Sequence, residues 1–368
     1  MNKLTVNNKL RVAIAGLGFG EAVHLKAIKE SKNFIPVALW HPKEDRLKVS
    51  TERHKIRGYS SWNSLLNDKN IDAIIIATPP EPRFQLALEA LKARKHLLLE
   101  KPVSLNHQQV IDLQKIALKE RLSVAVNFEY RAVPFFIQTQ NMLMQNYIGK
   151  PWLIKLDWLM SSRANTNRPW NWYSDIEKGG GVIGALGTHA IDILHWLIGP
   201  TETISGMIST SIKERPILKE KKLMPVSSED ICLAQLGLRE QTNGELIPAQ
   251  VTLSSVCKEG RGFWLEIYGS EGTLVLGSSN QKDYVHGFGI WHSKTGERLK
   301  SISPEPNLQF STTWEDGRVA PIQKIHNLWS TSIRNGTPII PGLSEGLASQ
   351  KVCDKIYESA RSGIMLKI

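Results

Sequence analysis

The first third of the chain alternates short, almost continuously apolar runs with segments of amphipathic spacing. The run at residues 10–16 ends in a glycine turn, and the run at residues 72–78 is closed by two prolines. Further strand-like runs occupy residues 34–40, 96–100 and 122–128, and helical spacing occurs at 21–31, 61–67, 84–94 and 106–120. Buried strands that alternate with helices are typical of a parallel sheet covered by helices on both faces.

After about residue 128 the pattern changes to alternating, strand-like segments between turn signals. Examples are residues 151–159, 249–255 and 263–269, and helical spacing returns near 132–147, 189–198, 321–334 and 344–361. We therefore predict an α/β protein of two domains. Residues 1–128 form an N-terminal Rossmann domain with a doubly wound parallel sheet. Residues 129–368 form a C-terminal α+β domain with an open, mostly antiparallel sheet, whose last helices can pack back on the first domain.

Length and composition agree with two globular domains. The chain has 368 residues, 41% hydrophobic and 22% charged, and no run approaches the about 18 consecutive apolar residues of a membrane span. The polar residues 1–9 lack the apolar segment of a secretory signal. Cys232, Cys257 and Cys353 are widely spaced, which argues against a disulfide framework or a zinc site. We expect a cytoplasmic protein with no membrane partner and no bound metal.

The formal net charge of +11 raises nucleic acid as a partner. The basic residues are scattered, and acids interrupt their densest runs, which is typical of a solvated surface. We therefore expect no nucleic-acid partner, while the basic field favours an anionic cofactor or substrate.

The turn Gly16-Leu17-Gly18 indicates dinucleotide binding because a strand precedes it and a helix follows. The first glycine makes the turn, the second lets backbone approach a pyrophosphate, and the helix N-terminus offers N–H donors. The third position of the usual fingerprint is Glu21, and Gly20 comes one residue early. We expect Glu21 to point away from the phosphates. The alternative is that the glycines only shape a tight turn.

The end of the second strand bears on the choice between NAD and NADP. NAD enzymes usually place an acid there, but the strand ends in His41-Pro42-Lys43. His41 or Lys43 could face a 2′-phosphate, so the sequence leans slightly towards NADP, although Glu44 and Asp45 follow at once.

Three groups of motifs resemble the glucose–fructose oxidoreductase / inositol dehydrogenase / MocA (Gfo/Idh/MocA) family. They are Gly16 to Gly20 with His24, Ala77-Thr78-Pro79 and Glu100-Lys101-Pro102; then Gly179 to Gly181 with Gly187-Thr188-His189 and Asp192; and finally Ser344 to Gly346 with Tyr357 to Arg361. Together they span nearly the whole chain.

The resemblance implies hydride transfer between NAD(P) and a hydroxyl carbon of a sugar, polyol or related compound. It implies a substrate site in the C-terminal domain and a homodimer or homotetramer formed through the open sheet. Together with the glycine turn and the end of the second strand, it gives the expected cofactor contacts, which are Gly16, Gly18, Phe19, Gly20, His41, Lys43, Thr78, Pro79, Glu100 and Lys101. The family pairs the lysine of Glu-Lys-Pro with an aspartate and a histidine; Lys101 and His189 match, but the aspartate position is Ala185.

Alcohol oxidation needs a cation near the developing alkoxide and a base for the hydroxyl proton. Lys101 can supply the cation, and a cis Lys101–Pro102 bond would fix it further. Thr188 is expected to cap a helix that begins at His189 and ends before Gly199-Pro200, where the dipole would favour the neutral imidazole of a general base. His24 and His195 lack this setting, and we interpret them as packing or surface residues.

The proton route is left open by Ala185. Asp192 could share a helix face with His189, or it could simply satisfy the helix N-terminus. Tyr173, Asp175 and Glu129 are further candidates that the sequence does not rank.

Residues 163–173 form a loop of polar and aromatic side chains before the triple glycine. Trp170, Trp172 and Tyr173 could stack on a sugar ring or could pack an interface, and the two interpretations stand equal. Arg163 or Arg168 could bind a substrate carboxylate or phosphate.

These features favour an NAD(P)-dependent oxidoreductase acting on a sugar-like hydroxyl or carbonyl. Lys101 is then the electrostatic catalyst and His189 the acid–base. A cofactor-bound ligand sensor without chemistry is one alternative, and Ala185 is its main support. A hydrolase or lyase that uses transient oxidation is the other.

Overall fold

The computed structural model describes residues 9–218, 220, 222–241, 244–280 and 283–368. Residues 1–8, which contribute to the inference that no secretory signal is present, lie outside this part. The chain divides into two compact units, residues 1–132 with 312–347 and residues 133–311 with 348–368. Within the described residues, no helix combines the length and apolar character needed to cross a membrane.

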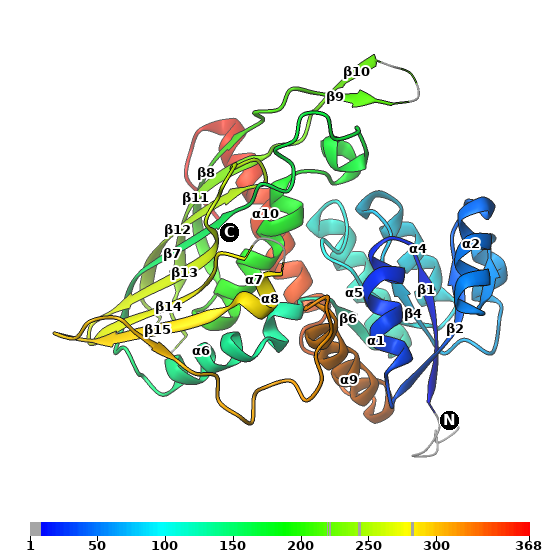
Figure 1. Ribbon diagram of the computed structural model, residues 1–368, viewed down its shortest axis with the longest axis horizontal. Coiled ribbons are helices and arrows are strands. Elements are labelled where there is room, and N and C mark those ends of the chain that lie inside the picture. The colour runs from blue at the N-terminus through cyan, green and yellow to red at the C-terminus, as the bar shows by residue number, and fades with distance from the viewer. Residues whose placement is uncertain (1–8, 219, 221, 242–243, 281–282) are drawn as a thin grey trace. The chain divides into compact units, whose positions relative to one another are not determined.

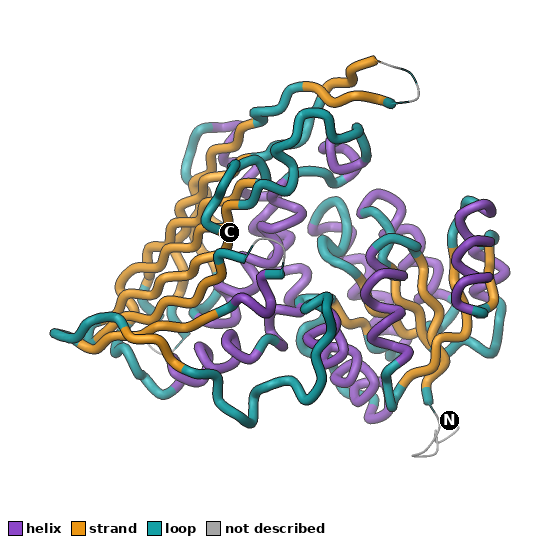
Figure 2. The backbone as a smooth tube through the Cα atoms, viewed as in Figure 1, coloured by secondary structure: helices purple, strands orange, loops and turns teal. Residues whose placement is uncertain are grey.

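The first unit contains a parallel sheet of six strands in the order β3-β2-β1-β4-β5-β6 (Figures 1 and 2). This is the doubly wound order in which the strand sequence reverses between β1 and β4, and ligands bind at the carboxyl ends of the strands beside that point. The strands are β1 (Leu10–Ala15), β2 (Phe34–Trp40), β3 (Arg57–Tyr59), β4 (Ala73–Ile76), β5 (His96–Leu99) and β6 (Val124–Val126). The predicted Rossmann fold is confirmed.

Alternating side chains of the strands feed two apolar layers. Ala13 and Ala15 of β1 face α3, α4 and α5, whereas Val12 and Ile14 face α1, α2 and α9. The helices are α1 (Leu25–Lys29), α2 (Glu44–His54), α3 (Trp62–Leu66), α4 (Pro80–Lys92), α5 (His107–Glu120) and α9 (Val319–Asn335). α9 comes from the far end of the sequence. Its Trp329 is fully buried in the same apolar layer as Val12 and Ile14.

The second unit is built on a nine-stranded sheet in the order β16-β15-β14-β13-β7-β12-β11-β8-β17. Among the described strands of this sheet, only β7 and β12 pair in parallel, so the predicted open, mostly antiparallel sheet is confirmed. Its strands are β7 (Pro151–Leu159), β8 (Thr201–Ser209), β11 (Ile231–Arg239), β12 (Leu246–Ser254), β13 (Gly262–Gly269), β14 (Gly272–Ser278), β15 (Gly289–Lys294), β16 (Lys300–Ile302) and β17 (Leu366–Lys367).

The helices of the second unit are α6 (Pro134–Met144), α7 (Thr188–Leu197), α8 (Tyr284–Gly287) and α10 (Leu343–Ser362), the last of which starts in the first unit. A separate hairpin joins β9 (Glu214–Ile217) to β10 (Lys222–Pro225). Alternate residues of β11 are buried, as a sheet covered on one face requires.

Candidate active site

The glycine turn after β1 has the geometry that a dinucleotide needs. Gly16 has a φ of +105°, and a Cβ there would lie 2.5 Å from the carbonyl oxygen of Ala77, so only glycine fits. Gly18 is exposed, and a Cβ there would meet nothing within 4 Å among the described residues. Backbone at Gly18 is therefore open to close approach by a ligand, which is the role of the second glycine in the fingerprint.

Gly20 performs the packing role of the missing third glycine. A Cβ at Gly20 would lie 2.9 Å from Cγ2 of Ile14 and 3.2 Å from Cβ of Ala77. The helix that follows is continuous from Phe19 and contains a π-helical turn at Gly20–His24 before α1. Close packing of helix on strand is thus achieved one residue earlier than the usual spacing.

The carboxylate of Glu21 contacts polar side chains of α2. Its carboxylate accepts hydrogen bonds from Ser50 Oγ at 2.8 Å and Arg53 at 2.9 Å, and it lies 2.8 Å from His54 Nε2. Burial acts to raise the pKa of Glu21, but the hydrogen bonds from His54 and Ser50 hold it below its usual value. The acid in the fingerprint therefore joins the π-helical turn at Gly20–His24 to α2.

The end of β2 carries no acid. His41 is half-buried, its Nδ1 accepts from the backbone N–H of Lys43 at 3.0 Å, and burial lowers its pKa. Lys43 is exposed and precedes α2.

Arg83 of α4 joins the turns that follow β4 and β5. Its guanidinium is buried and donates to the carbonyl oxygens of Thr78, of Glu100 at 2.6 Å, and of Pro102. The Lys101–Pro102 peptide is cis. Thr78 Oγ1 is buried and has no hydrogen-bond partner among the described residues, which fits a nucleotide that would bond to it. Pro79 immediately precedes α4.

Glu100 ends a chain of buried polar groups. Its Oε1 lies 2.8 Å from His24 Nε2 and accepts from Asn127 Nδ2 at 2.7 Å, while His24 Nδ1 lies 3.0 Å from His326 Nε2. Burial acts to raise the pKa of Glu100, but the hydrogen bond from His24 lowers it below the usual value. Burial lowers the pKa of His326 well below that of an exposed histidine. These shifts fit an ionised Glu100 and a neutral His326.

Lys101 is half-buried and lies among charged groups of its own unit. Burial lowers the pKa of its ammonium, while the carboxylates of Glu129 and Glu100 act to raise it. Glu129 follows β6 in a short 3-10 turn and is itself buried. Burial raises the pKa of Glu129 to about 7, and the charge of Lys101 opposes that rise. An ammonium and a carboxyl whose proton affinities are moved towards neutrality suit proton exchange near the pH of turnover.

The second unit positions His189, but differently from the sequence expectation. A helix runs from Val182 without a break through a π-helical turn at Ile183–Gly187 into α7, so His189 lies inside it. Thr188 is not an N-cap, because its hydroxyl donates back to the Gly184 carbonyl at 3.0 Å. The prediction that the helix dipole acts on His189 in a first turn was wrong. His189 is buried, and its ring centroid lies 6.2 Å from that of Trp158 on β7.

The same extension of the helix changes the interpretation of Asp192. Asp192 is buried in the middle of the helix, so it does not satisfy the helix N-terminus. Ala185 lies in the π-helical turn, one turn before His189. Asp175 caps a short 3-10 turn by accepting from the Glu177 N–H at 3.1 Å. His195 accepts from the Thr201 N–H at 3.1 Å, in keeping with a packing role.

Glu229 takes the place at the helix start that the sequence had assigned to Thr188. Its carboxylate accepts from the Ile183 N–H at 2.8 Å and from the Tyr357 hydroxyl at 2.9 Å. Burial raises the pKa of Glu229 to about 7. Gly181 makes room for it, since a Cβ there would lie 2.3 Å from the carboxylate. The triple glycine thus lets a buried acid cap the helix that carries His189.

The loop after β7 places its aromatic residues in different settings. The Arg163 guanidinium lies 3.9 Å from the centre of the buried Tyr173 ring. Trp170 Nε1 donates to the Pro225 carbonyl at 2.9 Å, so this indole fastens the loop to the hairpin of β9 and β10. Trp172 is half-buried and lies edge-on to Tyr173, with ring centroids 5.9 Å apart.

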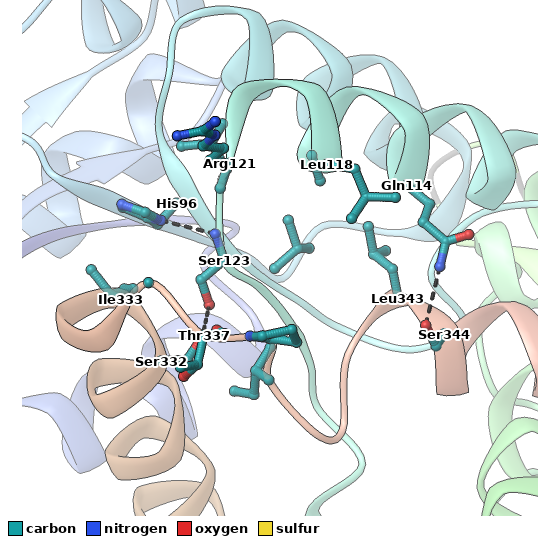
Figure 3. A pocket seen from close by; sticks show the side chains of 16 residues that line it. His96, Gln114, Leu118, Arg121, Ser123, Ser332, Ile333, Thr337, Leu343 and Ser344 are labelled. Atoms are coloured by element: carbon teal, nitrogen blue, oxygen red, sulfur yellow. Dashed lines mark hydrogen bonds between the residues drawn. The ribbon is translucent and has the colours of Figure 1, made fainter.

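A cavity of about 310 Å³ in the first unit lies away from these groups. It is lined by α5, the C-terminal part of α9 and residues at the amino ends of β5 and β6 (Figure 3). Its polar lining is bonded internally: Ser123 Oγ to Ser332 Oγ at 2.7 Å, and Gln114 to Ser344 at 3.1 Å. Because nucleotide turns follow the carboxyl ends of the strands, this cavity is not the dinucleotide site.

Three contributors to the site escaped the sequence analysis. Arg83 and Glu229 stand outside every motif, so only their burial reveals them. His24 stood within the resembling motif, yet it was interpreted as a packing residue. The structure places it on Glu100 instead.

Family models match both parts of the chain. Residues 10–128 match the oxidoreductase family's NAD-binding Rossmann fold, and residues 140–368 match that family's C-terminal alpha/beta domain. The chain is 39% identical over 353 residues to an uncharacterized oxidoreductase of Synechocystis sp., covering 95% of this chain and 94% of that one. It is 24% identical over 357 residues to the glucose-6-phosphate 3-dehydrogenase of Bacillus subtilis, covering 95% of each.

A levoglucosan dehydrogenase is similar in both sequence and structure. The enzyme from Pseudarthrobacter phenanthrenivorans is 26% identical over 331 residues, covering 82% of this chain and 81% of its own. A solved levoglucosan dehydrogenase in complex with NADH and L-sorbose superposes with a TM-score of 0.85 at 20% identity, covering 98% of this chain and 99% of that one.

The nucleotide turn, the Glu-Lys-Pro turn and the family models define the class: the protein is an oxidoreductase with an NAD-binding Rossmann domain. More particularly, the chain belongs to the Gfo/Idh/MocA family of oxidoreductases, as its motifs had suggested.

Proposed function

We propose that this chain transfers hydride between a nicotinamide and the hydroxyl or carbonyl carbon of a sugar, polyol or related compound. The observation that carries the proposal is Lys101, a half-buried ammonium at the carboxyl end of β5 with the carboxylates of Glu129 and Glu100 acting on it. The names of two relatives, a levoglucosan dehydrogenase and a glucose-6-phosphate 3-dehydrogenase, support a carbohydrate substrate.

Bound nicotinamide would accept or supply the hydride. Lys101 would hold the substrate oxygen by charge and stabilise the developing alkoxide. His189 would exchange the hydroxyl proton as the acid–base. Asp192, Trp172 and Tyr173 are proposed as substrate contacts, and Trp170 as a residue that holds the loop in place.

The test replaces Lys101 with Met, which keeps the length of the side chain and removes its charge. We expect turnover against a panel of sugars and polyols to fall by about 10²–10⁴-fold, with nucleotide affinity changed by only about a few-fold. Lys92→Met, at an exposed position on α4, is the matched control. Wild-type turnover in Lys101→Met would refute the assignment.

The same panel of sugars and polyols distinguishes hydride transfer from the two alternatives, a ligand sensor and an enzyme that uses transient oxidation. Ala185 in place of the family aspartate favours a sensor, which would hold nucleotide tightly and turn over nothing. An enzyme that uses transient oxidation would convert substrate with no net change in nucleotide absorbance at 340 nm, so products must also be followed by chromatography.

For the cofactor we propose a slight preference for NADP. Support comes from the half-buried His41 and exposed Lys43 at the end of β2, where no acid stands to bind a ribose 2′-hydroxyl. His41→Asp should raise the dissociation constant of NADPH relative to that of NADH by about tenfold. Tighter NADH binding by the wild type would overturn the preference.

We further propose that residues 1–128 bind the nucleotide, while the domain at residues 129–368 binds substrate and joins copies of the chain. One face of its sheet exposes Leu153 beside Tyr268 and Leu233 beside Met207, which suits contact with a second copy. Sedimentation should show a dimer or tetramer that Leu233→Lys weakens. We place the protein in the cytoplasm, a proposal that its three free cysteines support.

A further inference from the structure

Three arginines gather in the loop after β7 and on the neighbouring strand β9. Arg163 and Arg168 lie on the loop, and Arg215 is buried on β9. Their charges act on one another, because Arg168 and Arg215 both help to lower the pKa of Arg163. Within the described residues, no carboxylate lies at ion-pair distance from any of the three.

Two of the arginines are used to build the loop. Arg215 donates to the carbonyl oxygens of Asn165 at 2.8 Å and Arg163 at 2.7 Å. Arg168 donates to the Ser162 carbonyl at 3.1 Å. They shape the backbone around Arg163 and add positive charge beside it.

The guanidinium of Arg163, unlike those of Arg168 and Arg215, is not used to bond the backbone of the loop. It lies over the Tyr173 ring, 3.9 Å from the ring centre, and it makes no side-chain hydrogen bond to the described part of the chain. A guanidinium carries five N–H donors, and a stacked one presents their fork edgewise. Burial lowers its pKa to about 10, so the group is partly desolvated without a compensating anion.

The position of Arg163 connects it to the part of the second unit that carries His189. Trp158, whose ring lies beside His189, is on β7, and Arg163 follows that strand by four residues. Backbone bonds fix this end of the loop, since the Arg163 N–H donates to the Ser255 carbonyl at 2.8 Å. Tyr173 is fixed as well: its carbonyl accepts from Ser228 Oγ at 2.8 Å and leaves room only for glycine at Gly180.

We propose that Arg163 binds an oxyanion, a carboxylate or a phosphate, carried by the sugar-like substrate. The stacked fork matches the two oxygens of such a group in a bidentate pair, and the charges of Arg168 and Arg215 strengthen the attraction. This inference rests on the proposed function, and it narrows the substrate to acidic sugars.

The test compares matched probes with the full chain: D-glucose, D-glucuronate and D-glucose 6-phosphate, and the corresponding forms of galactose and mannose. Binding is measured by calorimetry with nucleotide present, and kcat/KM is measured for each. We expect one anionic series to exceed the neutral sugars by at least about tenfold, and the favoured series identifies the oxyanion. Arg163→Met should remove most of that preference, and Arg163→Lys should restore only part of it.

Arg261→Met is the matched control. Arg261 also lies over an aromatic ring, 5.6 Å from that of Trp264, but it is paired with Asp157 at 3.1 Å and Glu266 at 3.2 Å. Its replacement should leave the preference for anionic sugars unchanged.

The outcomes separate this inference from the proposed function. Anionic sugars that bind through Arg163 but are not oxidised would sustain the inference and count against hydride transfer. Equal binding of neutral and anionic sugars, or an anionic preference that survives in Arg163→Met, overturns the inference whether or not turnover occurs. If Arg163→Met weakens the binding of NADPH but not of anionic sugars, the oxyanion bound by Arg163 belongs to the nucleotide. That result would also overturn the inference.

Discussion

His24 and Glu100 share a buried hydrogen bond, with His24 Nε2 2.8 Å from Glu100 Oε1. With Glu100 ionised, His24 Nε2–H is the donor in this bond, and His24 Nδ1 lies 3.0 Å from His326 Nε2. The chain of imidazoles links α9, from the end of the sequence, to the residue before Lys101. Glu100 thereby stays charged in a setting where burial alone would favour its protonated form.

Replacement of His24 by Leu should therefore destabilise the protein in a pH-dependent way. Without the donor at His24, the buried Glu100 carboxylate should cost about 2–3 kcal/mol at pH 7. Its pKa would then rise above the unfolded value, so its stabilising contribution is lost as the pH rises and recovered as the pH falls. Urea unfolding should show a larger difference from wild type at pH 7 than at pH 4.5. His24→Gln, which keeps a donor, should lie between the two, and a pH-independent loss would contradict the ionised state of Glu100.

The sequence predicted what depends on local pattern. Continuous apolar runs located β1, β2, β4, β5 and β6, because these strands are covered on both faces. Period-3.6 spacing located α4, α5, α9 and α10 to within a few residues, because each of these helices buries one face. The sequence analysis missed α2 and β3, since Glu44–His54 has only two buried residues and Arg57–Tyr59 has one. A short or solvated element gives little hydrophobic periodicity.

The site was predicted less completely than the fold. Lys101 and the glycine turn came from motifs, but Glu100 bonds to His24, 76 residues away along the chain, and His24 in turn to His326, 302 residues from it. Thr188 was misread because Glu229, which is distant in sequence, caps the helix from Ile183 onwards. Tertiary hydrogen bonds of this kind leave no local signal.

Replacement of Glu129 by Gln should shift the alkaline limb of the pH–rate profile. The Glu129 carboxylate raises the pKa of Lys101, which burial lowers. Its removal should therefore lower the pH at which Lys101 loses its proton. If charged Lys101 stabilises the alkoxide, kcat should begin to fall at correspondingly lower pH. Glu120→Gln, at the end of α5, should leave the limb in place, and an unmoved limb in Glu129→Gln would disconnect Glu129 from Lys101.

His96 should make the first unit sensitive to mild acid. Its Nδ1 accepts from the Ser123 N–H at 3.0 Å, which requires the neutral ring, and burial lowers its pKa to about 4. The unfolded chain binds this proton near pH 6.5, so stability falls as the pH drops from about 6.5 to about 4, by about 1–2 kcal/mol at pH 5.

His96→Asn keeps an acceptor for Ser123 but does not titrate. The variant should lose less stability than wild type between pH 7 and pH 5, when unfolding is followed by urea at fixed temperature. At pH 8 protonation of His96 no longer affects stability. The difference in unfolding free energy between variant and wild type at that pH therefore measures the change in packing alone. A gap that stays constant from pH 8 to pH 5 would show that His96 is not the group responsible.

Gly16 and Gly18 should respond in opposite ways to the same added methyl group. At Gly16 the methyl would lie 2.5 Å from the Ala77 carbonyl at a φ of +105°, so Gly16→Ala should lower the free energy of unfolding by about 1–3 kcal/mol. At Gly18 the methyl would meet no described atom within 4 Å, so Gly18→Ala should unfold like the wild type. The space it enters is where the pyrophosphate approaches backbone, and NAD(H) affinity should fall by about tenfold or more. Thermal melting of both variants measures the effect on stability, and nucleotide titration measures the effect on affinity. Unchanged affinity in Gly18→Ala would mean that the glycines shape the turn without touching the nucleotide.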